Sequence, residues 1–342
     1  MMNNTAKKSF FGNPYIQYAI FGVCILIVPA LVSAGVFRKS VLAIVGGAMV
    51  YTVAALGLNL LLGYAGSISL GTAGFMGLGA YISAVLNEDV GLPWEFSAII
   101  SIAIATLIGL VVGVLSLKMS GLYLGIATLC IAEIFRKSFG EFTQLTGGFS
   151  GKSASYPKLL GTFKLGQTGT FILIIVFMVL SMMLLYNIVH GQMGRALHAI
   201  RSSQTAAQAM GVSIRKYRLI AFAFASGYAA LSGVLYVHFI RFVYPSTWNL
   251  VLSLNILAMI VIGGLRSIYG TFFGALIVYA VPDLVLKRIP VIGDFEGLAY
   301  IFSGILIILV IMFSRGGLAG FYMDLRRKNK AKSQEKVSDK QE

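Results

Sequence analysis

Long apolar runs separated by short polar connections make up most of the chain. Most of these runs have the roughly 17–25 residues that an α-helix needs to cross a hydrocarbon core of about 30 Å. The strict alternation expected of a membrane-barrel strand is not seen. The pattern therefore predicts an all-α polytopic membrane protein with about 10 transmembrane helices (8–10). The expected spans are residues 15–37, 41–62, 74–87, 96–117, 121–137, 169–190, 218–240, 248–264, 268–286 and 297–314.

Composition favours a membrane protein over a soluble domain. Of the 342 residues, 58% are hydrophobic and 11% are charged, whereas about a quarter of the residues in soluble domains are charged. Mean hydropathy is +0.86. The net charge of +15 lies mainly in connections and near the C-terminal end, so it indicates membrane orientation and no nucleic-acid partner. Cys24 and Cys130 lie far apart in apolar runs, which predicts small core residues without a disulfide or a metal.

The distribution of basic residues sets the orientation. The connection 191–218 is basic and has no acid, and the segment from residue 315 contains "RRKNKAK" (Arg326–Lys332). Basic loops remain in the cytoplasm. Four expected spans lie between these two segments and six precede the first, so the N-terminus is expected inside as well.

This orientation divides the chain into a cytoplasmic segment 1–14, a transmembrane domain 15–314 and a flexible basic tail 315–342. It places the acidic segment 87–95 outside, but four basic residues near the outer face count against it. These are Arg38, Lys39, Arg136 and Lys137. The first apolar run ends in small residues, Leu31–Gly35, where a signal peptidase could cut. An uncleaved helix is preferred because the run is longer than a typical signal-peptide core.

A glycine-rich segment, "GLNLLLGYAGSISLGTAGFMGLGAY" (Gly57–Tyr81), is unusual for a helix, because each interior glycine costs about 1 kcal/mol relative to alanine. One interpretation is close packing of membrane helices. The other is a broken or re-entrant segment near 63–80 that lines the transport pathway, with hydroxyls from Ser67, Ser69 and Thr72. The later "GGLRSIYGTFFGA" (Gly263–Ala275) repeats the Ser-Ile, Gly-Thr order, as an internal repeat or by chance.

Other polar side chains also fall at membrane depth. Glu133 lies in an apolar helix, where a lone acid is costly. It either pairs with Arg136 and Lys137 on the same helical face or lines the pathway and meets a substrate ammonium. Asn59, Tyr123 and Asn255 serve in helix packing or contact the solute. The expected pathway residues are Asn59, Ser67, Ser69, Thr72, Tyr123 and Glu133.

The basic connection has the pattern of a short amphipathic helix. Apolar residues recur on one face, while Arg195, His198, Arg201 and Ser202 gather on the other. The apolar positions are Leu197, Ile200, Ala207 and Met210. From pattern alone, this helix lies on anionic lipid or docks on a partner.

The stretch "LTGGFSGKSASYP" (Leu145–Pro157) looks like a phosphate-binding loop at first sight. The spacing excludes that function, because Gly147 is one residue too close to Gly151 and the preceding segment is not an apolar strand. The connection 138–168 is expected on the outer face, with Lys152 and Lys158 as solvated charges.

Five ordered motifs resemble the LivM permeases of bacterial branched-chain amino-acid ABC importers. They are "GLNLLLGYAGSISLGTAGFMGLGAYISAVL", "GLYLGIATLCIAEIFR" (Gly121–Arg136), "LTGG" (Leu145–Gly148), "GRALHAIR…AAQAMGV" and "LNILAMIVIGGLRSIYGTFFGA" (Leu254–Ala275). The resemblance covers roughly residues 40–315 and identifies the family better than the solute, because relatives carry other amino acids, amides or urea. It implies a multi-pass protein of the bacterial inner membrane.

The resemblance also implies partners and roles. The partners are a second, LivH-type permease, two LivG/LivF-type ATPase subunits and a substrate-binding protein, with no cofactor on this chain. The family's E-A-A-x-x-x-G coupling helix corresponds to Ala206, Ala207 and Gly211, with Thr205 in place of the acid. Arg195 and Arg201 are the expected salt links to the ATPase. The outer loop that meets the binding protein would include Gly147, Gly148 and Phe149.

Two other classes of protein remain as alternatives. An ion-coupled secondary transporter usually carries acids near the membrane midplane, and only Glu133 is available. A membrane-embedded enzyme needs a catalytic constellation, and no nucleophile with an adjacent base is visible. We therefore expect a non-enzymatic permease that works by alternating access, with ATP hydrolysis in separate subunits.

Overall fold

The computed structural model describes residues 13–35, 39–119, 121–159 and 163–284, together with several positions between 301 and 321. The predicted segment 1–14 is described only from Asn13. Most of the predicted span 297–314, and the basic tail beyond residue 321, lie outside the described residues.

The described chain is predominantly helical. The first half contains α1 (Pro14–Ile25), α2 (Ile27–Ser33), α3 (Lys39–Leu58), the π-helix η2 (Asn59–Tyr64), α4 (Thr72–Glu88), α5 (Trp94–Ser116), α6 (Leu122–Glu141), α7 (Thr143–Thr146) and the 3₁₀-helix η3 (Gly148–Ser150). The second half contains α8 (Gln167–His190), α9 (Gln192–Ser202), α10 (Gln204–Ala209), α11 (Ile214–Ile240), η4 (Pro245–Thr247), α12 (Leu250–Gly263), α13 (Ile268–Ala275), the π-helix η5 (Leu276–Ala280) and α14 (Val281–Leu284).

In the described residues, four strands of two residues each lie in the connections between helices. Strand β1 (Lys152–Ser153) pairs antiparallel with β4 (Phe242–Val243), and β2 (Lys158–Leu159) pairs antiparallel with β3 (Phe163–Lys164). The first pair ties the connection after α6 to the end of α11.

The helices identify a multi-pass membrane protein. Within the described residues, six segments are long and apolar enough to span a bilayer: 14–32, 40–64, 94–116, 167–190, 214–240 and 245–263. Helix α4 has 17 residues, and α6 carries four charged residues; neither is among the six. Length and hydropathy therefore establish fewer spans than the ten predicted.

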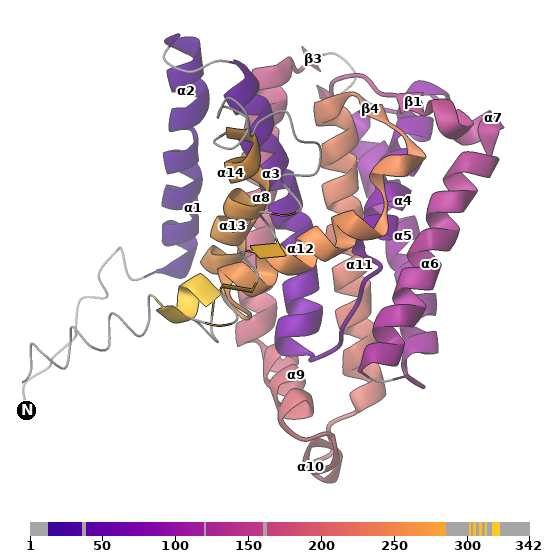
Figure 1. Ribbon diagram of the computed structural model, residues 1–342, viewed down its shortest axis with the longest axis vertical. Helices are drawn as coiled ribbons and strands as arrows, with labels where there is room; N and C mark the ends of the chain where they lie inside the picture. The colour runs from indigo at the N-terminus through magenta and orange to yellow at the C-terminus, as the bar shows by residue number, and fades with distance from the viewer. Residues whose placement is uncertain are drawn as a thin grey trace, which may run out of the picture.

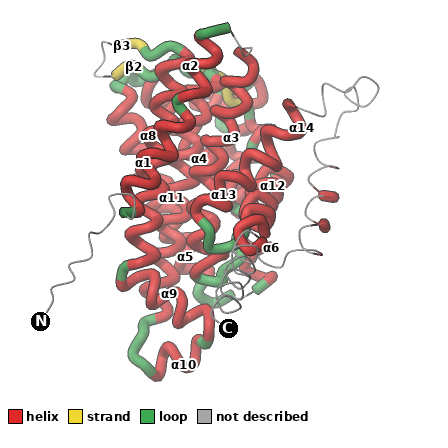
Figure 2. The backbone as a smooth tube through the Cα atoms, turned by 90° about the vertical axis from the view of Figure 1, so that its left-hand side faces the viewer, coloured by secondary structure: helices red, strands yellow, loops and turns green. Residues whose placement is uncertain are grey.

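The bundle has two distinct ends (Figure 1). Helices α9 and α10 lie at one end, and α7, β1 and β4 lie at the other. The view turned by 90° shows the same separation, with β2 and β3 opposite α10 (Figure 2). The connection after α6 and the basic connection 191–218 thus lie at opposite ends, as their predicted placement on opposite faces requires.

The core forms around α11, which packs against α3, α4 and α5. Glycines allow these backbones to approach closely. A Cβ added at Gly79 would lie 2.3 Å from the carbonyl oxygen of Ala230, and one added at Gly233 would lie 1.8 Å from that of Met76. The α4 glycines therefore serve close helix packing, the first of the two interpretations of the glycine-rich segment.

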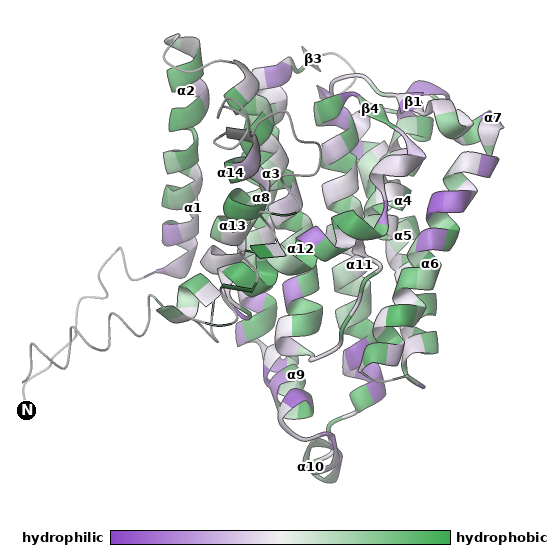
Figure 3. Ribbon diagram, viewed as in Figure 1, coloured by the Kyte–Doolittle hydropathy of each residue, from purple (hydrophilic) through white to green (hydrophobic). Residues whose placement is uncertain are grey.

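Apolar residues dominate the helices between the two ends, while a hydrophilic stretch stands out on α6 near α7 (Figure 3). Cys24 and Cys130 are free and exposed, so the prediction that they are core residues is wrong. Both lie on outward faces of α1 and α6, where a small apolar side chain can face lipid.

Helix α12 departs from a simple membrane crossing. It lies across the bundle at a large angle to α11, and α13 then runs back toward the end that carries β4 (Figure 1). The predicted spans 248–264 and 268–286 therefore form a hairpin whose turn, residues 264–267, lies against the end of α3.

Candidate functional site

The chain leaves helical geometry between α3 and α4. The last six residues of the long third helix are π-helical, and residues 65–71 follow without helix. Gly66 permits the break because its φ of 68° lies in the left-handed region. The break separates two helices within one apolar stretch, and exposes backbone groups that need other partners.

Side chains from neighbouring helices satisfy these backbone groups. The N–H of Leu70 donates to Thr128 Oγ1 on α6 at 2.9 Å, and the N–H of Ala73 donates to Ser253 Oγ on α12 at 3.1 Å. The predicted pathway residues of this segment are all buried, with exposed fractions of 5–6%: Ser67, Ser69 and Thr72. The segment is thus inside the bundle and held on two sides.

A second break lies between α12 and α13, where Gly264 and Arg266 have φ of 106° and 67°. Asn59 holds this turn. Its Oδ1 accepts from the Arg266 N–H at 2.9 Å, and its Nδ2 donates to Thr271 Oγ1 at 2.8 Å and to the Ser267 carbonyl at 3.3 Å. The Asn59 side chain is completely buried. Its whole amide is engaged by the hairpin.

Tyr64 adds a further link between the two breaks, because its hydroxyl donates to the Arg266 carbonyl at 2.7 Å. Gly63 keeps the space open, since a Cβ there would lie 2.2 Å from Asn59 Oδ1. Sequence reasoning identified Asn59 but missed Tyr64 and Thr271. The repeated Ser-Ile, Gly-Thr order was the available signal, because one copy precedes α4 and the other begins α13.

The basic connection forms two short helices, α9 and α10. Their apolar face is buried at Leu197, Ile200 and Ala207, as the pattern predicts. Met210 is 84% exposed, so its predicted place on that face is wrong. Helix α10 ends at Ala209, and Gly211, with φ of 79°, turns the chain away.

The two arginines of α9 have different surroundings. Arg201 is half-buried, and its guanidinium donates to the Leu62 carbonyl at 3.4 Å. Burial and the positive charge of Arg266 lower the pKa of Arg201. Arg195 is exposed, as are Ala206 and Gly211. The structure thus joins Arg201 to η2, the π-helical segment after α3. Of the other predicted coupling residues, it buries Ala207 and leaves Arg195, Ala206 and Gly211 at the surface.

Glu133 and Tyr123 lie on α6, away from the Asn59 cluster. Glu133 forms an ion pair with Arg136, including a hydrogen bond of 2.8 Å from Arg136 Nε. The Glu133 side chain is 44% exposed and Tyr123 is 76% exposed. These two predicted pathway residues therefore face the outside of this chain, and they would line a path only beside another subunit.

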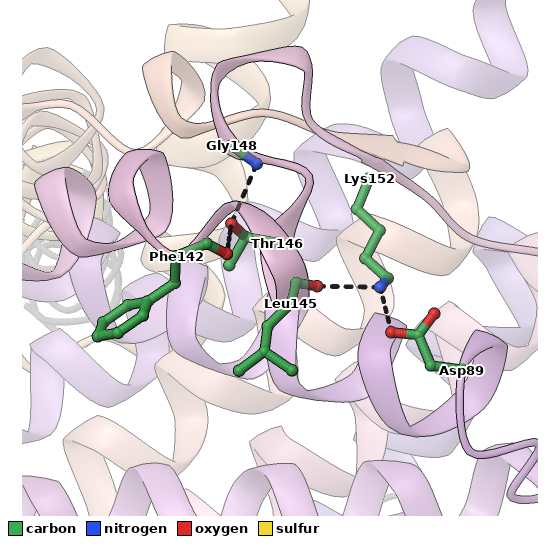
Figure 4. Close-up of polar contacts among 6 residues, drawn as sticks. All are labelled: Asp89, Phe142, Leu145, Thr146, Gly148 and Lys152. Atoms are coloured by element: carbon green, nitrogen blue, oxygen red, sulfur yellow. Dashed lines mark hydrogen bonds and ion pairs between the residues drawn. The ribbon is translucent and has the colours of Figure 1, made fainter.

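The loop after α6 is anchored at its base (Figure 4). Lys152 Nζ forms an ion pair with Asp89 and donates to the Leu145 carbonyl at 2.9 Å, and Thr146 Oγ1 accepts from the Gly148 N–H at 3.2 Å. The Lys152 side chain is only 14% exposed. The prediction that Lys152 is a solvated charge is therefore wrong, because it pairs with an acid at the end of α4.

The tip of this loop remains free for contact. Gly147, Gly148 and Gly151 all have positive φ, between 61° and 78°, and so serve as the predicted turn residues. Phe149 is 75% exposed, with one edge of its ring against Gly140. A second anchor lies further along, where His238 Nδ1 is 2.9 Å from the Ser155 carbonyl. The loop is a fixed platform that displays an aromatic ring.

These features, two interlocked helix breaks, a basic helical connection and an anchored loop at the far end, suit a transport permease. The family model "Branched-chain amino acid transport system / permease component" matches residues 40–311, which is most of the chain. The chain belongs to this family. The resemblance inferred from the five motifs is confirmed.

Several similar proteins are also named as transport permeases. The chain is 28% identical over 331 residues to the high-affinity branched-chain amino acid transport system permease protein LivM of Escherichia coli, covering 89% of this chain and 75% of the relative. It is 28% identical to LivM of Salmonella typhimurium, covering 79% and 68%. It is also 28% identical to the autoinducer 2 import system permease protein LsrC of an Enterobacter strain, covering 80% and 78%. No solved structure matches.

Proposed function

We propose that this chain is one of two membrane subunits of an ATP-driven importer for branched-chain or related amino acids. The observation that carries the proposal is the family match over residues 40–311, together with relatives named for branched-chain amino-acid transport. Separate ATPase subunits hydrolyse ATP, and this chain has no enzymatic role. It lies in a bacterial inner membrane with about ten helices and both termini in the cytoplasm.

The basic end of the bundle is the ATPase docking face. Helices α9 and α10 project beyond the other helices (Figure 1) and present Arg195, Ala206 and Gly211 at the surface. A groove in an ATPase subunit receives this pair, and Arg195 forms salt links to acids there. Arg201 then transmits the movement of the docked α9 and α10 to η2 through its hydrogen bond with the Leu62 carbonyl.

The opposite end meets the substrate-binding protein. The loop carrying Gly147, Gly148 and Phe149 is suited to this contact because its base is fixed by the Lys152–Asp89 pair while Phe149 stays exposed. An exposed aromatic ring on a rigid base is a favourable anchor for a partner protein.

The solute path runs between this chain and a second, LivH-type permease. The break between α3 and α4 forms a re-entrant segment beside the path, and its hydroxyls come from Ser67, Ser69 and Thr72. Asn59 holds this segment against the α12–α13 hairpin. Glu133 and Tyr123 reach the path from the exposed face of α6, where the second permease packs.

Another small solute is the second candidate cargo, because a relative of equal identity is named for autoinducer 2 import. Amides and urea belong to the same alternative. An ion-coupled transporter is disfavoured, since Glu133, the acid required for it, is half-exposed and already paired.

Reconstitution of the complete complex tests the function. The chain, its partner permease, both ATPase subunits and the binding protein are placed in proteoliposomes, and uptake of labelled leucine is measured with and without ATP. We expect uptake that requires ATP and the binding protein. Uptake by this chain alone, driven by an ion gradient without ATP, would refute the proposal.

A further inference from the structure

A cavity of about 350 Å³ lies between α3, η4, α12, η5 and α14, in the half of the bundle that carries β4. Its described polar lining consists of hydroxyl and amide side chains: Tyr51, Tyr244, Ser246, Thr247, Asn249, Asn255 and Tyr279. Among the described residues that line it, there is no Asp, Glu, Lys, Arg or His. The volume falls at the lower end of small-molecule sites, which occupy roughly 300–1,000 Å³.

The amides of the two asparagines differ in what they already bind. Asn249 Oδ1 accepts from the Leu252 N–H at 2.9 Å, and its Nδ2 donates to the Ser246 carbonyl at 3.2 Å. Asn255 is half-buried on α12, and its side-chain amide makes no hydrogen bond with any residue in the described part of the chain. This amide is therefore available to a ligand, and a ligand that covers it must supply a polar partner, because an unsatisfied amide in apolar surroundings is costly.

The remaining wall is apolar and aromatic. Leu252, Met259 and Val278 supply aliphatic surface. Tyr51 and Tyr279 lie with ring centroids 4.8 Å apart, and both line the cavity. Aromatic faces attract a cation such as an ammonium group, while aliphatic walls accept a hydrocarbon side chain.

We propose that this cavity binds the transported solute during passage and that its ligand is a zwitterionic amino acid with an uncharged aliphatic side chain. This rests on the proposed importer function. The Asn255 amide and the hydroxyls of Ser246 and Thr247 bind the carboxylate, and the tyrosine faces attract the ammonium group. The described part of the lining carries no charge, which suits a ligand whose own two charges cancel.

Two other cavities have a different character. One of about 560 Å³ lies between α5, α8 and α11, and one of about 320 Å³ lies between α4 and α6. Both are lined almost entirely by apolar side chains, with few hydroxyls. A lipid chain suits them better than a zwitterion, so of these three cavities in the described part of the chain the one beside Asn255 suits the solute best.

Uptake by the complete complex gives the first test. Asn255→Leu keeps a side chain of similar size but removes the amide, and we expect leucine uptake to fall about tenfold, the order expected for losing a hydrogen bond to a charged group. Asn255→Gln, which retains the amide, should recover part of the rate. Leu254→Ala, at the exposed neighbour on the same helix, is the control and should resemble wild type. Copurification with the ATPase subunits checks assembly.

Cysteine protection gives a second test that does not depend on the transport rate. In a Cys24→Ser, Cys130→Ser background, Asn255→Cys is treated with a water-soluble methanethiosulfonate in complexes holding leucine-loaded or leucine-free binding protein. Leucine should slow its modification. Ser150→Cys, on the exposed outer loop, reports shielding by the docked binding protein alone and should show no difference between the two.

The outcomes distinguish a failure of the cavity site from a failure of the importer function. Unchanged uptake by Asn255→Leu, or a modification rate at Asn255→Cys that leucine does not alter, overturns the cavity site while the importer function stands. A wild-type complex that takes up no amino acid under ATP overturns the proposed function itself.

Discussion

The Oδ1 atom of Asn59 accepts a hydrogen bond of 2.9 Å from the backbone N–H of Arg266, across 207 positions of sequence. The same amide donates to Thr271 on α13. Because Arg201 on α9 contacts the Leu62 carbonyl three residues along from Asn59, the short π-helix η2 joins the basic connection to the α12–α13 hairpin. A displacement of α9 therefore has a direct route to the hairpin.

Replacing Asn59 by Leu should break this route. The change leaves the Arg266 N–H without its acceptor, and an unsatisfied buried group costs about 1–3 kcal/mol of folding stability. We expect a lower thermal unfolding temperature and a loss of uptake greater than the loss of ATPase activity. Uptake and ATPase activity are measured on the same reconstituted complex.

The control for Asn59 is Thr52→Val, another buried polar change on α3. Among the described residues, the Thr52 hydroxyl bonds only to the Ala48 carbonyl within its own helix, so this substitution should reduce stability without separating uptake from ATP hydrolysis. Equal loss of both activities in Asn59→Leu would contradict a role in coupling.

The fold was predictable where one physical signal dominated. Apolar runs of spanning length located α1, α3, α5, α8 and α11, because in lipid a backbone must satisfy its own hydrogen bonds. The basic connection was predicted as an amphipathic helix because Leu197, Ile200 and Ala207 recur at helical spacing. All three are buried, but on two short helices instead of one, because the chain breaks at Ser203. Both signals are local, so they can be recognised in the sequence without knowledge of the tertiary structure.

The candidate site depended on long-range partners, which the sequence does not reveal. Asn59 was recognisable as a buried polar residue, but its hairpin partner Thr271 lies 212 positions away. Lys152 was misjudged because its partner Asp89 is 63 positions distant. The oblique path of α12 was also hidden, since its composition alone is that of a membrane crossing.

Arg195 and Arg201 should respond differently to substitution. Arg195→Glu should weaken binding of the ATPase subunits, because the exposed guanidinium would be replaced by a charge that repels acids in the docking groove. Arg201→Met should leave that binding intact while reducing uptake, since it removes the contact with Leu62. Pull-down of the ATPase at several salt concentrations and uptake measurements separate the two effects.

The reverse pattern would change the assignment of roles. If Arg201→Met abolishes ATPase binding while Arg195→Glu has no effect, Arg201 belongs to the docking face and its contact with α3 is secondary. His198→Ala serves as a control on the same helix for nonspecific loss of α9.

Glu133→Gln tests whether α6 faces the solute path. The substitution removes the negative charge but preserves size and some hydrogen bonding to Arg136. We expect a marked fall in leucine uptake with normal subunit assembly, because the ammonium of the solute would lose an attractive charge. Uptake at the wild-type rate would instead assign Glu133 to the ion pair alone, whose exposed position makes it worth about 1 kcal/mol or less.

The loop after α6 supplies the sharpest test of orientation. Deleting Phe149–Ser153 should weaken transport and the stimulation of ATPase activity by the binding protein, while the ATPase subunits still copurify, because this loop lies at the end opposite α9 and α10.

The milder Phe149→Ala removes only the 75% exposed ring and should raise the half-saturating concentration of binding protein about tenfold, the order of a modest hot spot. Lys152→Met, which loses the anchor to Asp89, should have an intermediate effect because the ring remains but its base is looser. Loss of ATPase binding on deletion would place this end of the bundle in the cytoplasm and invert the proposed orientation.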